Sequence, residues 1–306
     1  MEGKSRTIQS KERRAAYLFL LPWIIGFFIF YFIPILIATA LGFYKYSILN
    51  PPRFVGLANF VDVFKDSLFW TSLSNSFYMV YIGVPLQILA GLSVALLLNM
   101  KVKGLAYYRA IYYLPAIVPM VASAILWLWM FNPQFGYINA ALSFIGIQGP
   151  EWLGSTVWAK PAFIMMRVWA AGATMIIYLA GLKNIPVQFY EAAELDGANS
   201  FQKFLRITLP LLTPTLFFTS LTGVIFAFQI FTQAYIMTGG GPVDSTMFLV
   251  YYLYDSAFVY FKMGYACAIT LILFFIILAF SLFQVKIAPL WVHYEVGRRG
   301  DKWQKK

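Results

Sequence analysis

Charged residues are scarce in this sequence of 306 residues, of which Asp, Glu, Lys and Arg make up only 11%. A typical soluble domain carries about 25% charged residues, so the composition argues against one. The sequence also has a single cysteine, Cys267, and a single histidine, His293. One cysteine excludes an internal disulfide, and one histidine excludes a histidine-based metal or catalytic cluster. We therefore predict no catalytic residue, no metal site and no cofactor.

Two further absences concern the energy source. The Walker A pattern, GxxxxGK followed by Ser or Thr, occurs nowhere in the sequence. The chain therefore cannot hold ATP phosphates by that device, and if ATP drives this protein, a partner subunit must bind the nucleotide. The long apolar segments also contain no Asp, Glu or His, although a proton-coupled transporter is expected to place such residues there. This absence weighs against a secondary transporter.

Apolar residues, by contrast, make up 61% of the chain and form six long runs. Each run has roughly 20–29 residues, enough for a helix to cross a hydrocarbon core about 30 Å thick. The first run is too long for the core of a signal peptide, which has about 7–15 residues, so we predict an uncleaved span. The chain is expected to be an all-α membrane protein with a single transmembrane domain over residues 1–306. Its six helices are predicted at residues 16–43, 76–98, 107–131, 156–182, 211–237 and 263–285.

Basic residues cluster beside these runs. The N-terminal segment, the turn after residue 98, the loop 183–210 and the C-terminal tail together hold 17 Lys and Arg, whereas the opposite loops hold five. Because loops rich in Lys and Arg stay in the cytoplasm, both termini and the loop 183–210 are predicted to be cytoplasmic. This distribution assigns the net charge of +11 to a membrane protein and argues against nucleic acid as a partner.

The loop 183–210 is predicted to form two short helices around an elbow. Pro186 suits the first position of a helix, where a missing N–H costs nothing. Gly197 stands where helices commonly end in a left-handed residue, and Asn199 and Ser200 are both good N-caps for a second helix. That helix is predicted to end at Pro210. Its residues at helical spacing, which share one face, are Phe201, Phe204, Leu205 and Thr208.

Three short sequences within this loop form one longer motif: Glu191-Ala192-Ala193, Asp196-Gly197-Ala198 and Ile207-x-Leu209-Pro210. They resemble the EAA loop of bacterial ABC importer permeases, a pattern long enough to be specific. The resemblance implies a coupling helix that docks into a groove on a cytoplasmic ATPase subunit. The alternative is a solvated loop that merely joins two spans. The residues expected to couple are Glu191, Ala192, Ala193, Asp196, Gly197, Ala198, Phe201, Phe204 and Leu205.

Other segments resemble the carbohydrate-uptake branch of this family, in particular the first of two membrane subunits of the maltose or glycerol-phosphate type. They include Thr238-Gly239-Gly240-Gly241-Pro242 and Gly264-Tyr265-Ala266. Phe54-Val55-Gly56-Leu57 resembles an outer segment of the family as a whole. The extra spans and large insertion of the maltose-type member are missing. The resemblance implies a multi-pass protein of the bacterial cytoplasmic membrane. Its implied partners are a second homologous permease subunit, two ATP-binding subunits and an extracytoplasmic sugar-binding protein.

Four side chains within the spans are candidates for a substrate path: Arg167, Gln229, Gln233 and Tyr235. A charge that faces lipid at mid-bilayer is costly, so Arg167 is expected to face protein or water, either on the path or in a structural hydrogen bond. Amides on packed membrane helices more often bond across helices than to a ligand. Even so, amides and a ring in the outer half of the fifth span suit a neutral polyhydroxyl ligand. The alternative function is a secondary transporter or facilitator for small polar solutes.

Overall fold

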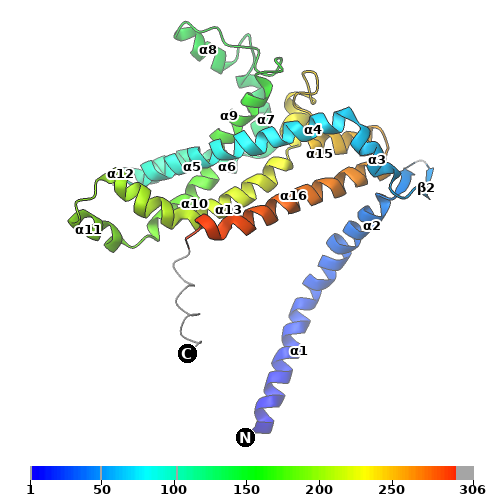
Figure 1. The fold of residues 1–306 in the computed structure, drawn as a ribbon, viewed down its shortest axis with the longest axis horizontal. Helices are drawn as coiled ribbons and strands as arrows, with labels where there is room; N and C mark the ends of the chain where they lie inside the picture. The colour runs from blue at the N-terminus through cyan, green and yellow to red at the C-terminus, as the bar shows by residue number, and fades with distance from the viewer. Residues whose placement is uncertain (1, 49, 101–102, 294–306) are drawn as a thin grey trace. The chain divides into compact units, whose positions relative to one another are not determined.

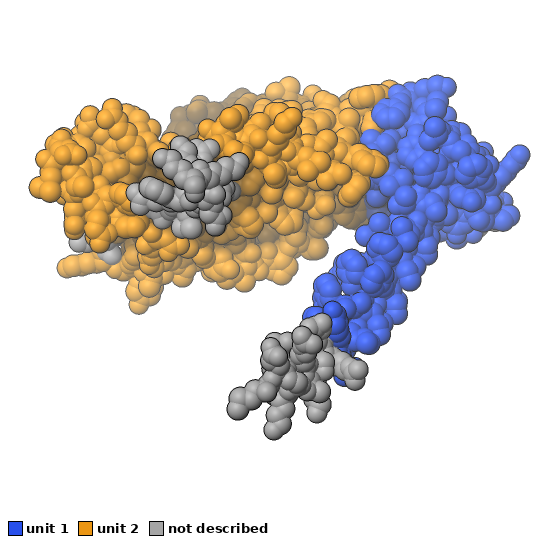
Figure 2. All heavy atoms as spheres, turned by 60° about the horizontal axis from the view of Figure 1, so that its bottom comes forward, with its two compact units in different colours: residues 1–65, 253–272 blue, residues 66–252, 273–306 orange. Residues whose placement is uncertain are grey.

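A computed structural model describes residues 2–48, 50–100 and 103–293, and gives only the backbone course for residues 2–14. The chain divides into two compact units. Residues 1–65 and 253–272 form unit 1, and residues 66–252 and 273–306 form unit 2 (Figure 2). The described part of the chain is mostly helical, but it also holds a two-stranded sheet, so the all-α prediction is correct only in part.

Unit 1 begins with one long helical run, in which α1 (Glu2–Phe27), the π-helical turn η1 (Phe28–Phe32) and α2 (Ile33–Leu41) follow without a break. Two short antiparallel strands, β1 (Tyr44–Ser47) and β2 (Asn50–Phe54), come next, and α3 (Ala58–Lys65) follows them. The side chain of Asn59 in α3 donates to the backbone oxygens of Gly42 and Tyr44, at 2.9 Å each. These bonds fix α3 against the chain that leaves α2. The unit also contains η4 (Asp255–Val259) and the first part of α16 (Met263–Trp291).

Unit 2 holds the remaining helices, and the central ones lie side by side (Figure 1). Before the loop 183–210 they are α4 (Ser67–Tyr78), η2 (Met79–Gly83), α5 (Val84–Asn99), α6 (Leu105–Ile117), α7 (Met120–Met130), α8 (Tyr137–Phe144), α9 (Ala159–Trp169) and α10 (Gly172–Lys183). From the loop onward they are α11 (Val187–Leu195), α12 (Ser200–Lys203), η3 (Phe204–Thr208), α13 (Leu209–Phe228), α14 (Thr232–Met237), α15 (Leu249–Tyr254) and the rest of α16.

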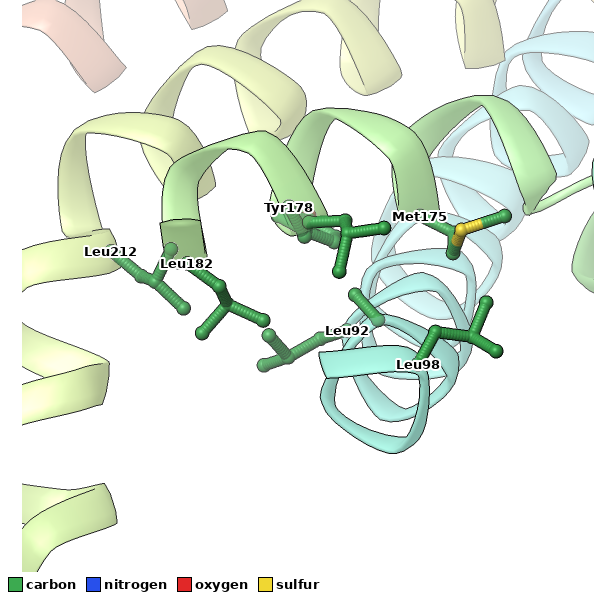
Figure 3. Close-up of a cluster of buried hydrophobic side chains, with 8 residues drawn as sticks. Leu92, Leu98, Met175, Tyr178, Leu182 and Leu212 are labelled. Atoms are coloured by element: carbon green, nitrogen blue, oxygen red, sulfur yellow. The ribbon is translucent and has the colours of Figure 1, made fainter. Parts of the chain in front are cut away.

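The core of unit 2 lies where α5, α10 and α13 meet. Figure 3 shows Leu92 and Leu98 of α5 beside side chains of α10, and Leu212 of α13 closes the cluster. The helices approach closely because small residues stand at the contact. A Cβ on Gly91 of α5 would lie 2.6 Å from the hydroxyl of Thr174 in α10, as expected for helix pairs packed within a membrane. The Tyr178 hydroxyl is satisfied by Thr219 of α13 at 2.6 Å.

The described helices include four that are long and apolar enough to cross a membrane, namely residues 15–41, 67–99, 200–228 and 263–291. Two further pairs qualify only as bent spans. The axes of α6 and α7 differ by 99°, and those of α9 and α10 by 45°. The predicted third and fourth spans, 107–131 and 156–182, are therefore not single straight helices. The predicted fifth span, 211–237, is also interrupted, because α13 ends at Phe228 and α14 begins at Thr232.

Several prolines lie within continuous helices and do not interrupt them. Each of η1, η2 and η3 ends two residues before a proline, at Pro34, Pro85 and Pro210 respectively. A proline lacks an N–H and its ring clashes with the carbonyl four residues back, and a wide π-helical turn placed just before it accommodates both defects. The prediction that the loop's second helix ends at Pro210 is therefore wrong, because α12, η3 and α13 form one continuous helix.

The sharper break between α6 and α7 has a different cause. Val118 precedes Pro119 and is extended, with φ −65° and ψ 129°, as the residue before a proline tends to be. Two residues then leave the helical path, and α7 starts in a new direction. At the α9–α10 break, a Cβ on Gly172 would lie 2.1 Å from the carbonyl oxygen of Tyr112 in α6. Only glycine allows α10 to begin this close to α6.

Candidate functional site

The loop between α10 and α13 forms the predicted helix–elbow–helix. The first helix, α11, begins one residue after Pro186, which occupies the N-cap. At the other end, Gly197 has φ +77°, the left-handed conformation that favours glycine. The N–H of Gly197 donates to the carbonyl of Glu194 at 3.0 Å, and that of Ala198 to the carbonyl of Ala193 at 2.9 Å. This pair of bonds is a Schellman motif, which satisfies carbonyls at the helix end.

The second helix of the loop starts with a capping box. The Asn199 side chain accepts from the Gln202 N–H, and the Gln202 side chain accepts from the Asn199 N–H, both at 2.9 Å. Asn199, one of the two predicted caps, is thus the N-cap. Asp196, which precedes the elbow glycine, does not cap this helix. Its side chain is exposed and makes no hydrogen bond with the described residues.

Two side-chain contacts close the elbow, and the sequence analysis found neither. The ammonium of Lys203 in α12 donates to the carboxylate of Glu194 in α11 at 2.6 Å. Hydrogen bonding and charge attraction from Lys203 hold the pKa of Glu194 below its usual value. The hydroxyls of Tyr190 and Thr208 lie 2.9 Å apart and join α11 to η3. Both pairs connect residues on opposite sides of the elbow, so helical spacing within either helix could not identify them.

The outer surface of this elbow mixes exposed apolar residues with acids. Leu195 is 90% exposed and Phe201 is 69% exposed, and Glu191 lies on the exposed surface of α11. Of the predicted coupling residues, Glu191, Ala192, Asp196, Gly197, Phe201 and Leu205 are exposed, and Ala193, Ala198 and Phe204 are half-buried. Figure 1 shows α11 beside α12 at one end of unit 2. Leu195 joins this surface although no motif pointed to it.

A cavity of about 470 Å³ lies between the helices of unit 2. The three helix breaks all reach it, because Met120 follows the first break, Ala170 lies in the second, and Gln229 to Phe231 form the third. Non-helical backbone within a membrane is tolerated only where protein buries it or water lines it. The other side chains that line the cavity come from η2, α5, α9, α10, α13 and α14.

Arg167 reaches this cavity from α9, and three elements hold it in place. Its Nε donates to the side-chain oxygen of Gln87 in α5 at 2.6 Å. Its Nη2 donates to the backbone oxygen of Gly223 in α13 at 2.9 Å. Gly83 of η2 lies beside the aliphatic part, since a Cβ there would be in ordinary contact with the Cδ of Arg167 at 3.7 Å. The prediction that Arg167 faces protein or water is confirmed.

The structure brings together three of the four predicted path residues. Arg167, Gln229 and Gln233 line the cavity, but Tyr235 does not and stacks on Phe231 at 5.5 Å between ring centroids. Whether any of the four contacts a substrate stays a prediction. The sequence analysis left out the hydroxyls of Thr219 and Thr222 and the rings of Phe226 and Phe231, which also line the cavity. In sequence, nothing separates these residues from ordinary membrane-helix residues.

The class of protein follows from comparison with known families. Residues 87–292 match the family described as binding-protein-dependent transport system inner membrane component. The match covers more than half of the chain, so the chain belongs to this family. It is therefore a multi-pass membrane protein and a permease subunit of an ABC importer, in which separate subunits hydrolyse ATP. This membership sets aside the alternative of a secondary transporter.

Individual relatives agree with this class. The chain is 43% identical to the probable ABC transporter permease protein YesP of Bacillus subtilis over 95% of its own length and 96% of that protein. It is 33% identical to the trehalose/maltose transport system permease protein MalF of Thermococcus litoralis, with coverages of 92% and 95%. Its fold resembles a chain in the crystal structure of a bacterial alginate ABC transporter in complex with an alginate pentasaccharide-bound periplasmic protein. That comparison has a TM-score of 0.77 and 27% identity, and covers 91% of this chain and 95% of the other.

Proposed function

We propose that this chain forms half of the translocation path of an ATP-driven sugar importer in a bacterial cytoplasmic membrane. Its partners would be a second homologous permease subunit, two ATP-binding subunits and an extracytoplasmic sugar-binding protein. Counted with each bent pair as one, it has six spans, and both termini and the loop 183–210 lie in the cytoplasm. The observation that carries this proposal is that the helices on either side of the elbow both lead to the cavity.

The first of these helices is α10. Its N-terminal half lines the cavity through Ala173, Thr174 and Ile177, and its C-terminal end leads through Pro186 into α11. The second is the continuous helix over residues 200–228, which begins in the elbow. It ends beside Gln229, at the cavity. At about 1.5 Å per residue, that helix spans roughly 40 Å. A displacement of the elbow by an ATP-binding subunit is thereby transmitted along two helices to the cavity.

The elbow has the properties of a docking element. It is stiff, because the Schellman motif, the capping box and the two cross-elbow contacts fix its shape. It also presents exposed Leu195 and Phe201, which a groove on another subunit could bury. Glu191 and Asp196 supply charges that set the register of such a contact. A mobile, fully polar loop would transmit no displacement.

The cavity lining suits a saccharide. Gln229 and Gln233 offer amides, Thr219 and Thr222 offer hydroxyls, and the Phe226 and Phe231 rings offer flat apolar faces. Sugars present hydroxyls at their edges and C–H groups on their faces, so amides and aromatic rings are suitable partners. The relative from Thermococcus litoralis, which is named for the transport of trehalose and maltose, supports the same substrate class.

The second permease subunit is proposed from the first span. Residues 15–41 form an apolar helix that the rest of unit 1 leaves unburied. Trp23, Phe27 and Tyr31 form a stacked row along it. Lipid covers part of such a surface, and we assign part of it to the partner permease, with which the cavity would form one path.

Transport in sealed vesicles tests this function. The chain would be reconstituted with a second permease, ATP-binding subunits and a sugar-binding protein from the same organism. Uptake of a radiolabelled sugar bound by that protein should require both internal ATP and the binding protein. Uptake that runs on an ion gradient without ATP would contradict the proposal. Vesicles that lack only the ATP-binding subunits provide the matched control.

A further inference from the structure

The cavity contains one charge and no counter-charge. Arg167 is the only ionisable side chain among the described residues that line it. No carboxylate in the described part of the chain lies within ion-pairing distance of its guanidinium; the ion pair found there, Lys203 with Glu194, belongs to the elbow. A charge held in the membrane interior without a partner is costly, and such charges commonly mark a substrate or ion path. A group of opposite charge for Arg167 would therefore have to come from outside the described part of the chain.

The hydrogen bonds of Arg167 leave donors for that anion. A guanidinium has five N–H donors, and the described residues accept from Nε and Nη2, through Gln87 and Gly223. Nη1 has no acceptor among the described residues. It is also not among the buried side-chain atoms that lack a hydrogen-bond partner, so the described chain does not enclose it. The bonds to Gln87 and Gly223 fix the orientation of the guanidinium plane. The position of Nη1 is therefore set before any ligand binds. Preorganised donors of this kind favour carboxylate and phosphate oxygens.

The surroundings of Arg167 also restrict the rest of the ligand. Gln229 and Gln233 line the same cavity, as do the rings of Phe226 and Phe231. A bare inorganic anion would use Arg167 and leave these groups without a role. A saccharide that carries an anionic group uses both, since hydroxyls meet the amides and the sugar face meets a ring. About 470 Å³ falls within the usual range for small-ligand sites.

We propose that the cavity takes an anionic saccharide, whose carboxylate or phosphate group pairs with Arg167. This inference rests on the proposed function and narrows its substrate class, from the neutral polyhydroxyl ligand expected from sequence to a charged one. Arg167 is thus a specificity-determining residue rather than only a brace between α5, α9 and α13. A brace alone would need no guanidinium nitrogen without an acceptor at a residue that lines the cavity.

Direct binding to the purified complex of permease and ATP-binding subunits tests the proposal, without the sugar-binding protein, whose own preference would otherwise dominate. Three probes are compared by calorimetry: α-1,4-trigalacturonate, the neutral trigalactoside of the same linkage, and glycerol 3-phosphate. A hydrogen bond to a charged group is worth about 1.5–3 kcal/mol, or about tenfold or more in affinity. The wild-type complex should therefore bind an anionic probe at least tenfold more tightly than the neutral one. The preferred anion identifies the group as carboxylate or phosphate.

Three variants distinguish the charge of Arg167, which would bind the anion, from its structural hydrogen bonds to neighbouring helices. Arg167→Gln should lose the preference, and Arg167→Lys should keep most of it because the charge remains. Lys160→Gln removes a cation from the same helix α9 but outside the cavity lining, so the preference should be unchanged. If the Arg167→Gln variant fails to assemble, the comparison of anionic and neutral probes on the wild-type complex still tests the proposal. Raising the salt concentration should weaken binding of the anionic probe and leave the neutral probe unaffected.

Equal or tighter wild-type binding of the neutral trigalactoside would overturn this inference and leave the sugar importer standing. A preference that survives in Arg167→Gln, or that does not respond to salt, would also overturn it. Failure of all three probes to bind, together with no ATP-dependent sugar uptake in vesicles, would overturn the proposed function itself.

Discussion

At the scale of single residues, Gly197 has the most specific structural role in the elbow. Its φ of +77° is one that residues with a Cβ seldom adopt, while a Cβ added there would meet no atom within 4 Å. Its substitution therefore tests backbone conformation without a steric clash. A Cβ in the left-handed region costs about 1–2 kcal/mol, and Asn tolerates that region better than other residues.

We expect the Gly197→Val variant to be expressed and inserted into the membrane normally. It should associate less with the ATP-binding subunits and should therefore transport less. Gly197→Asn should have a milder effect. Gly26→Val is the matched control, because Gly26 also has open space around its Cβ position but no positive φ. Co-purification of the ATP-binding subunits and uptake in vesicles measure the outcome. Normal coupling by Gly197→Val would show that the elbow conformation is not required.

The sequence predicted these local details well, because turn chemistry is local. A glycine after a helix and an asparagine before the next one carry their own conformational preferences, and both Gly197 and Asn199 follow them. The contacts of Glu194 with Lys203 and of Tyr190 with Thr208 depend on how far the elbow folds. That angle is set by both helices together, so sequence alone could not provide it.

At the scale of elements, the contact between Glu194 and Lys203 joins α11 to α12 and should make the elbow sensitive to acid. The pKa of Glu194 is lowered in the folded protein by Lys203. A depressed carboxylate pKa stabilises the folded elbow above the unfolded-state pKa, and this contribution is lost as the pH falls through the folded-state value. The elbow should therefore loosen in acid and stay unchanged at neutral and higher pH.

Spin labels at the exposed positions Gln188 and Ser200 would report this loosening as a broader distance distribution at acidic pH. Glu194→Gln should show the broader distribution at every pH, because the charge is already absent. An identical narrow distribution for wild type and Glu194→Gln would mean that the capping motifs alone hold the elbow.

The existence of the spans was easier to predict than their continuity. Apolar length alone identified the segments that are long and apolar enough to cross a membrane, but the α9–α10 break depends on the contact of Gly172 with Tyr112 of another helix. Prolines were ambiguous for a similar reason. Pro210 lies within a continuous helix behind the wide turn η3, whereas Pro119 accompanies a 99° bend. The resulting breaks form the cavity, so its lining could not be assembled from the sequence.

At the scale of the whole molecule, the distribution of Lys and Arg predicts which loops face the cytoplasm. Val243, in the loop after α14, and Leu195, in the elbow, are 87% and 90% exposed. Their near-equal exposure makes them a matched pair for labelling with an impermeant thiol reagent, in a background where Cys267 is replaced by Ala. We expect Val243→Cys to react from outside intact cells and Leu195→Cys to react only in inverted vesicles. The reverse pattern would exclude the proposed orientation.

The proposed function requires that the elbow over residues 187–208 receives the ATP-binding subunits. Hydrogen exchange, measured on the permease complex with and without those subunits, tests it most directly. We expect the subunits to slow exchange in peptides from residues 187–208. The Glu191→Lys variant should weaken this protection without changing exchange in the core around Met175 and Tyr178. Unchanged exchange across 187–208 in a complex that holds its ATP-binding subunits would contradict it.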